Sequence, residues 1–247
     1  MRFIDPLRVC RSPLRDPTFM KLLLFLALLL TGTTALRAAD PIYTVDFTTQ
    51  PNGPALPWLA SHGFETKLDF AALNPRFENG ALWLSSAKPA GGLCVCNFPP
   101  AHALKGVKRV RITWGVGSFA EGADWEHGNN RTPLAIMVSF GYEHFPSGLP
   151  LGINPAPYFI SPFLDAHDPD AKVYTGRFWK AGGRYVCIHC AKTGAPMISE
   201  VELDKLFQAQ FKKPVTPPVS AIGFQMNTRE TKGGASAFVK KIELLAE

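Results

Sequence analysis

The sequence lacks the short motifs that identify several common classes of enzyme. It contains no Gly-x-Ser-x-Gly, no His-Glu-x-x-His and no glycine-rich loop that could cradle a phosphate. A serine nucleophile, a zinc-protease centre and nucleotide chemistry are therefore unsupported. No motif predicts a cofactor, and no motif defines a reaction.

A strong excess of positive charge is also missing once the first 39 residues are set apart. The whole chain has 26 Lys and Arg against 20 Asp and Glu, whereas residues 40–247 have 20 against 18. A nucleic-acid-binding protein needs a basic face, and a few scattered lysines and arginines do not make one. We therefore expect no nucleic-acid partner. The sequence leaves the oligomeric state open.

Long apolar runs are absent except for one, KLLLFLALLL at Lys21–Leu30. This run is shorter than the roughly 20 residues that a membrane-spanning helix needs, so we expect no permanent span. Small residues follow it at Thr31–Ala39, which is the order typical of a secretory signal. We predict a signal peptide with an extended n-region over residues 1–39, unless Met20 is the true start, and one exported domain over 40–247, in the periplasm or outside the cell.

Cysteine is scarce, and the predicted domain has only two pairs, Cys94 with Cys96 and Cys187 with Cys190. Cysteines in an exported protein are usually joined in disulfide bonds, which is our prediction, with the pairing left open. A zinc site made from the same four residues, with His189 nearby, is the alternative.

Helical spacing occurs in only one stretch of the predicted domain, Val201–Phe211, which predicts a short surface helix. The 21 Gly and 22 Pro favour frequent turns. Between the turns, short runs rich in β-branched and aromatic residues predict strands. These runs are Ile42–Phe47, Gly92–Phe98, Val107–Val116, Leu134–Tyr142, Pro157–Phe163, Arg184–Cys190 and Met197–Leu203, and Arg76–Ser85 is predicted to be a hairpin around Asn79-Gly80.

The last part of the chain has two more such runs, Val219–Met226 and Ala237–Leu245, on either side of a polar loop that contains Gly233 and Gly234. We predict that they form a β-hairpin near the edge of a sheet, because lysines in the second run oppose further pairing. Together the runs predict an all-β protein, a jelly-roll-like antiparallel β-sandwich with one short surface helix.

Four segments, which together extend over nearly all of the predicted domain, carry a resemblance to a known family. They are EGADW at Glu121–Trp125, PLAIMVSFG at Pro133–Gly141, RYVCIHC with the later EVELDKLFQAQF, and PPVSAIGFQMNTRETKGGASAFVKKIEL near the end. With them the chain resembles the bacterial exported family known as domain of unknown function three thousand and forty-seven. The resemblance implies a jelly-roll-like sandwich in the cell envelope, and it implies no reaction.

A candidate ligand site lies in the polar loop Gly117–Pro133, which contains Trp125. A tryptophan ring can stack on the C–H face of a sugar while neighbouring polar groups bind its hydroxyls. Our leading hypothesis is a non-catalytic envelope module that binds a glycan, and the alternative for Trp125 is a ring packed back on the sandwich. The predicted polar residues around it are Glu121, Asp124, Glu126, His127 and Arg131, with Asn227 and Arg229 from the last loop.

Two other functions remain open at this point. An enzyme on the same scaffold, a polysaccharide lyase or hydrolase, could use His127 or Glu126 as base and Arg131 to neutralise a substrate carboxylate. That mechanism requires the three side chains to converge. A purely structural envelope protein is the other possibility.

The run LDAHDPDAK at Leu164–Lys172 has several carboxylates, which calcium prefers as ligands. It lacks the glycine and the closing glutamate of the familiar calcium loop, so we interpret it as an acidic turn and predict no metal.

Overall fold

The computed structural model describes residues 40–148 and 154–246. All of these belong to one compact unit, Ala39–Glu247. The predicted signal peptide, residues 1–39, lies outside the described residues. Within the described ranges, no helix is both long enough and apolar enough to cross a membrane.

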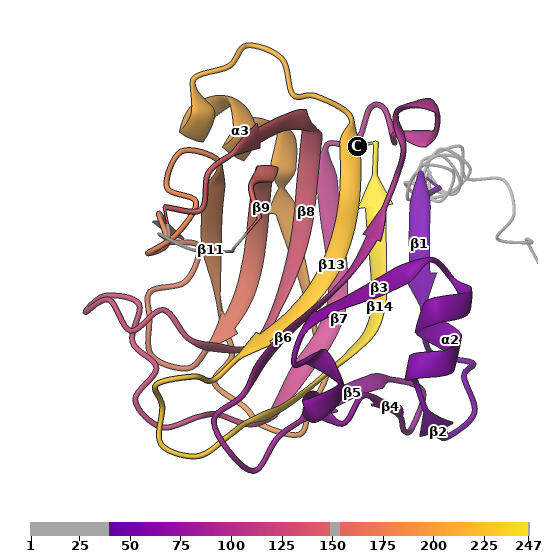
Figure 1. Cartoon of the computed structure of the whole chain (residues 1–247), viewed down its shortest axis with the longest axis vertical. Coiled ribbons are helices and arrows are strands. Elements are labelled where there is room, and N and C mark those ends of the chain that lie inside the picture. Colours follow the sequence, from indigo (N-terminus) through magenta and orange to yellow (C-terminus); the bar gives the residue numbers. More distant parts are fainter. Residues whose placement is uncertain (1–39, 149–153, 247) are drawn as a thin grey trace, which may run out of the picture. The chain divides into compact units, whose positions relative to one another are not determined.

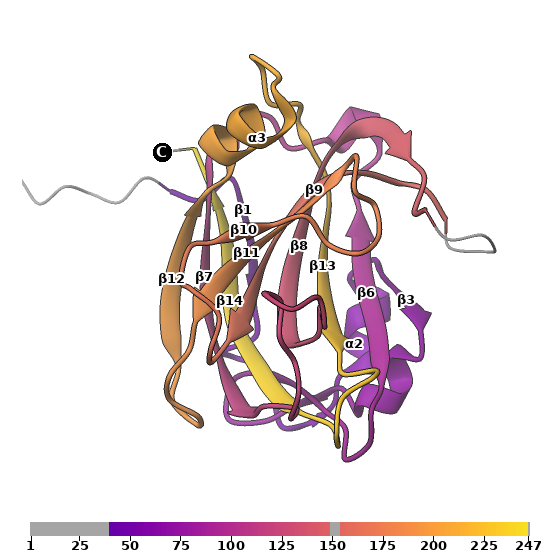
Figure 2. The same cartoon turned by 90° about the vertical axis from the view of Figure 1, so that its left-hand side faces the viewer.

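The chain folds into two facing β-sheets, as Figures 1 and 2 show. Sheet A has the order β12 (Met197–Glu202), β7 (Arg109–Ser118), β14 (Ser236–Leu245), β5 (Leu82–Ser85), β4 (Arg76–Phe77) and β2 (Gly53–Pro54), and β1 (Tyr43–Asp46) also pairs with β14. Sheet B has the order β10 (Val173–Tyr174), β11 (Gly183–His189), β9 (Ala156–Asp165), β8 (Thr132–Phe145), β13 (Val219–Asn227), β6 (Gly91–Asn97) and β3 (Phe64–Leu68). The predicted jelly-roll-like β-sandwich is confirmed, although β11 pairs with β9 in parallel.

The alternation of side chains along the strands explains the two layers. On β13, Ile222, Phe224 and Met226 are fully buried between the sheets, whereas Gln225 points to the other face and is partly exposed. Burying each such large apolar side chain contributes roughly 1.5–3 kcal/mol. Because successive side chains of a strand point to opposite faces, the residues between the core positions form the outer face of sheet B.

The predicted hairpin at the end of the chain is wrong in its pairing, although both strands exist. β13 lies in sheet B between β8 and β6, and β14 lies in sheet A, where it pairs with β7, β5 and β1. Residues 228–235 connect the two sheets. Composition indicates that a segment is extended, but it does not indicate which strand the segment pairs with. The loop of residues 228–235 is long enough to cover the roughly 10 Å between packed sheets. Both strands are central, so the predicted edge position is also wrong.

The predicted helix is confirmed as α3 (Leu203–Phe211), and the two residues before it belong to β12. Its buried Phe207 packs against Phe140 of β8 and Tyr158 of β9, with ring centroids 5.2 and 5.3 Å apart. Sequence patterns did not predict α2 (Leu56–Ser61), which is six residues long and buries only Leu59. Two single 3₁₀ turns complete the elements, η1 (Phe70–Leu73) and η2 (Pro100–His102).

All four described cysteines are free thiols, contrary to the disulfide prediction. Cys94 and Cys96 lie on β6, and Cys187 lies on β11, four strand positions away in sheet B. At about 4.8 Å per strand, the two pairs are roughly 19 Å apart, whereas a disulfide needs Cα atoms within about 7 Å. The zinc alternative has no support either, because no group of three or more potential ligands occurs in the part of the chain that the structure describes.

Candidate functional site

Trp125 is buried, so it cannot act as the predicted sugar platform. Only 5% of the residue is exposed, and its ring stacks on Phe163 of β9 with centroids 4.3 Å apart. Tyr174 and Tyr185 pack around it, and the indole N–H donates a hydrogen bond of 3.0 Å to the carbonyl of Arg131. The loop folds back on the outer face of sheet B because that face presents aromatic rings here. The alternative interpretation, a ring packed on the sandwich, is confirmed.

The acidic run after β9 is a structural turn. Asp165 is buried, and its Oδ1 accepts the backbone N–H groups of His167 and Asp168 at 2.6 and 2.9 Å. Asp168, also buried, accepts the backbone N–H groups of Trp125 and Glu126 at 3.0 and 3.3 Å. Burial raises the pKa of Asp168 even though these hydrogen bonds oppose the shift. Asp168 therefore holds the Trp125 loop in place, and Asp165 holds the turn that carries Asp168.

The proposed acid–base residues do not converge on one point. The carboxylate of Glu126 binds the amino group of Lys172 at 2.6 Å and the hydroxyl of Tyr174, and these two contacts lower its pKa. His127 is exposed and bonds to Asp124 at 2.8 Å. Mainly because the backbone N–H of His127 donates to Asp124, the pKa of Asp124 is lowered. The lyase or hydrolase arrangement predicted for these residues is not formed.

Arg131 instead connects two loops. Its guanidinium is almost buried and donates to the carbonyl of Arg229 and to the carboxylate of Glu230. A second ion pair, between Glu121 and Lys232 at 2.8 Å, joins the same two loops. The structure thus brings Glu121 and Arg131 of the predicted site against the 228–235 loop as structural contacts.

The other two predicted residues lie beside this connection. Arg229 is exposed and pairs with Asp69 at 2.8 Å. The side-chain oxygen of Asn227 accepts the backbone N–H of Arg229 at 3.2 Å. Since Arg229 is exposed while Trp125 is buried, they do not form the common rim that the sequence predicted.

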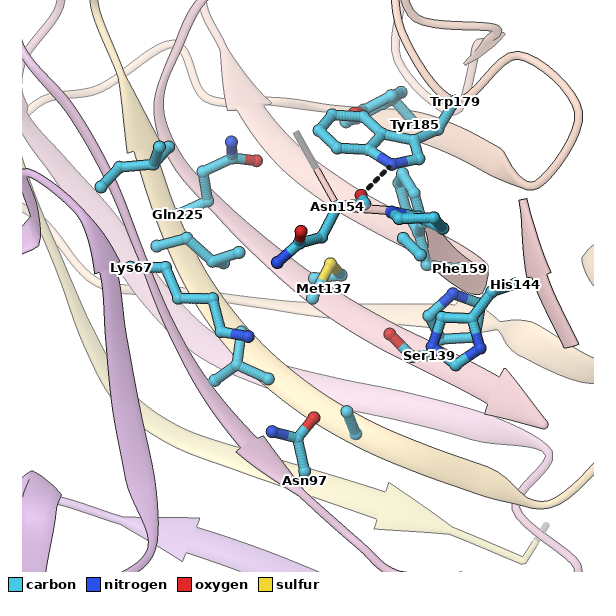
Figure 3. Close-up of a pocket in the computed structure, with 17 residues that line it drawn as sticks. Lys67, Asn97, Met137, Ser139, His144, Asn154, Phe159, Trp179, Tyr185 and Gln225 are labelled. Carbon is cyan, nitrogen blue, oxygen red and sulfur yellow. Dashed lines mark hydrogen bonds between the residues drawn. The ribbon is translucent and has the colours of Figure 1, made fainter. Parts of the chain in front are cut away.

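A groove of about 440 Å³ lies on the outer face of sheet B (Figure 3). It extends over strands β3, β6, β13, β8, β9 and β11, and over the loop residues before β9 and β11. The described residues that line it are Lys67, Leu68, Leu93, Val95, Asn97, Met137, Ser139, His144, Asn154, Pro155, Ala156, Pro157, Phe159, Trp179, Tyr185, Ala221 and Gln225.

The floor of this groove consists of rows of residues that are paired across strands β6, β13 and β8. Gln225 of β13 lies between Leu93 of β6 and Ala135 of β8. In the next row Gly223 lies between Val95 and Met137. Because glycine has no side chain, nothing projects from the floor of the groove at Gly223. A Cβ at this position would approach the carbonyl oxygen of Cys94 to 2.9 Å. The groove is thus a depression between taller side chains.

Two bulky apolar residues on the walls have an unusual backbone. Leu68, at the end of β3, has φ of +57° and is 63% exposed, and Trp179, in the loop before β11, has φ of +51°. Large L-residues rarely adopt this region, which costs on the order of 1–3 kcal/mol and is found mostly at functional sites. The indole N–H of Trp179 donates to the carbonyl of Asn154 at 3.3 Å, which orients the ring (Figure 3).

The groove combines apolar surface with uncharged hydrogen-bonding groups. Amides come from Asn97, Asn154 and Gln225, and none of the described lining residues is Asp or Glu. The Nδ1 of His144 donates to the carbonyl of Tyr142 at 2.8 Å, since a carbonyl can only accept. In the neutral imidazole, Nε2 is then left as an acceptor.

Sequence analysis missed this groove. Its signal was indirect: Leu93, Met137 and Gln225 stand at the alternate positions of strands whose other positions form the core. Trp179 was a further signal, because a Trp shortly before Gly182 and Gly183 is typical of an exposed turn rather than of a strand.

No protein-family model and no curated protein sequence matches the chain. Among solved structures, a family 12 xyloglucanase from Bacillus licheniformis is 8% identical, with a TM-score of 0.37 over 82% of this chain and 96% of its own. The xyloglucanase domain of NopAA, a type three effector from Sinorhizobium fredii in complex with cellobiose, is 9% identical, with a TM-score of 0.36 over 81% and 97%. A mutant of ENZbleach xylanase is 10% identical, with a TM-score of 0.37 over 87% and 94%.

Proposed function

We propose that the protein binds a glycan chain in the groove on the outer face of sheet B and does not cleave it. The observation that carries this proposal is the lining of the groove. Apolar and aromatic side chains, with Trp179 on one wall, stand among the amides of Asn97, Asn154 and Gln225. An aromatic face stacks on the C–H side of a pyranose, and amides exchange hydrogen bonds with its hydroxyls.

The backbone at the two walls supports a binding role. Leu68 and Trp179 keep unfavourable φ values and hold apolar side chains beside the groove. Strain of this kind persists where surrounding structure imposes it, and it clusters at ligand sites. A ligand that covers these side chains would remove their apolar surface from water, which is favourable by about 25 cal/mol per Å².

Binding without cleavage is favoured because a glycosidase of the usual kind needs two carboxylates on either side of the scissile bond. The described lining of the groove has no carboxylate. The acids that sequence analysis considered, Glu121, Asp124 and Glu126, are held in contacts with Lys232, His127 and Lys172. Among the described lining residues, none can therefore act as the acid or the base of a glycosidase of this kind.

The experiment is a binding survey with soluble plant and bacterial polysaccharides, measured by affinity electrophoresis and then by calorimetry. Trp179→Ala should weaken binding at least about tenfold, because stacking and apolar contact are lost together. Gln225→Ala should weaken it several-fold without touching the strained loop. Ile198→Ala is the matched control, because Ile198 is 67% exposed on β12 of the other sheet.

The survey also separates the competing functions. Release of shorter or unsaturated sugars by the wild-type protein would establish an enzyme and contradict the proposal. Absence of both binding and turnover across the panel would leave the structural role.

We further propose that the protein is exported and that it belongs to the family of unknown function it resembles. The support is the apolar run Lys21–Leu30 with its small-residue end, together with the four segments that carry the resemblance. Terminal sequencing of protein recovered from cell fractions tests the location. We expect a periplasmic or secreted product that begins at Leu36, Ala39 or Asp40, and an unprocessed product in the cytosol would contradict export.

A further inference from the structure

The charge in the groove is of one sign. Lys67, on β3, is the only Lys or Arg among the described lining residues, and it is exposed. No hydrogen bond or ion pair involves its amino group within the described residues. Glu65 has its side chain on the same face of β3, opposite Val95, but it forms no ion pair with Lys67 and does not line the groove.

Three cations of the loops around Trp125 are different, because each is held in an ion pair. Arg131 binds Glu230, Lys172 binds Glu126, and Lys232 binds Glu121. These pairs neutralise the loops at one end of sheet B. The groove therefore presents a positive charge that forms no ion pair with a carboxylate of the described residues.

Figure 3 shows how the polar groups are distributed around the groove. Lys67 extends from one side with its amino group directed toward Asn97, and His144 stands on the opposite side, with Met137 between them. A ligand lying over Met137 would have the ammonium group and an amide along one side of its path. A neutral sugar offers this ammonium only hydroxyl oxygens, whereas a carboxylate offers a charge-assisted hydrogen bond in a cleft with apolar walls.

We propose that the glycan is acidic, a polysaccharide containing uronic acids, and that Lys67 binds one of its carboxylates. This inference rests on the proposed glycan-binding function and adds the chemical class of the ligand. Asn97 would donate a second hydrogen bond from its amide to the same carboxylate. In this arrangement Lys67 on one wall selects acidic sugars by charge, and Trp179 on the other wall stacks on a sugar ring.

The test compares each polyuronate with its own carboxyl-reduced form. Reduction converts every carboxylate to a primary alcohol and leaves the linkage and chain length unchanged, so the two polymers differ only at that group, which loses its charge. Polygalacturonate, alginate and a glucuronate-rich glycan serve as probes, each with its reduced counterpart. We expect the wild-type protein to bind at least one acid form about fivefold or more tightly than its reduced form, with a preference that falls as salt is raised.

The variants assign this preference to one side chain. Lys67→Met keeps the length of the side chain and removes its charge, so it should abolish the preference, bringing the ratio of acid-form to reduced-form affinity to about one. Lys105→Met, an exposed lysine outside the groove, is the matched control and should retain the preference.

Each outcome is informative about one of the two proposals. Equal binding of acid and reduced polymers by the wild-type protein would overturn the acidic class while the glycan-binding function stands. A preference that Lys67→Met leaves intact would overturn the role of Lys67. Binding of neither form would overturn both proposals, and unsaturated products from a polyuronate would show a lyase instead of a binder.

Discussion

Replacing Trp125 by alanine should destabilise the protein strongly while leaving the groove able to bind its ligand. The ring is 5% exposed and stacked on Phe163, and its N–H is bonded to the carbonyl of Arg131. Removing a buried aromatic side chain of this size costs roughly 3–5 kcal/mol. For domains of 150–250 residues each kcal/mol corresponds to about 2–4 °C, so Tm should fall by on the order of 10 °C.

Thermal unfolding followed by circular dichroism measures this effect, and Trp125→Phe is the matched variant. Phenylalanine keeps the stacking on Phe163 but leaves the carbonyl of Arg131 without its indole donor, which costs about 1 kcal/mol, or about 2–4 °C. Glycan affinity of both variants, measured well below their Tm, should stay close to that of the wild-type protein. An unchanged Tm together with lost binding would refute this reasoning, because it would mean that Trp125 is an exposed platform.

Three further predictions follow from other parts of the structure. Hydrogen bonds from Arg111 and Arg109 lower the pKa of Glu200, so its stabilising effect is fully present above its ordinary pKa of 4.5 and is lost as the pH falls through the lowered pKa of the folded protein; Glu200→Gln should lower Tm at pH 7 and lower it less as the pH is taken below 4.5, and an equal loss at every pH would contradict this. A thiol reagent should label none of the four free cysteines in the folded domain and all four after unfolding without reductant, because they are buried and burial raises the pKa of Cys94 to about 12; fewer than four labelled thiols would indicate a disulfide. Gly92→Ala should reduce the free energy of unfolding by roughly 1–3 kcal/mol in a urea titration, because the new Cβ would lie 2.3 Å from the Cα of Phe70; a loss below 0.5 kcal/mol would show that this contact relaxes easily.

Local patterns in the sequence were sufficient to predict the long strands and the longer helix of the fold, but not the short elements α2, β3 and β10. Enrichment in β-branched and aromatic residues identified the long central strands, including β13 and β14, and helical spacing identified α3 almost to its ends. These signals are local because an extended or helical backbone imposes its own periodicity on the residues that face the core. The short α2, with a single buried residue, had too little periodicity to be recognised.

The partners of those elements depended on long-range contacts. The same alternation suits a strand in either sheet, so the sequence could not distinguish a hairpin from the crossover that places β13 and β14 in different sheets. The cysteines illustrate the same limit: their number is visible in the sequence, but the four strand positions that separate Cys94 from Cys187 are not.

The candidate site depended most on tertiary structure. In the sequence, Trp125 is surrounded by polar residues and resembles an exposed sugar platform, yet the rings of Phe163 and Tyr185 reach it from distant strands and bury it. The groove, in contrast, collects single residues such as Lys67, Gln225 and Trp179 from segments far apart in the chain. The sequence by itself determined the two-layer β architecture, because that follows from periodicity. Only the packing of distant strands decided which polar and aromatic residues share a surface.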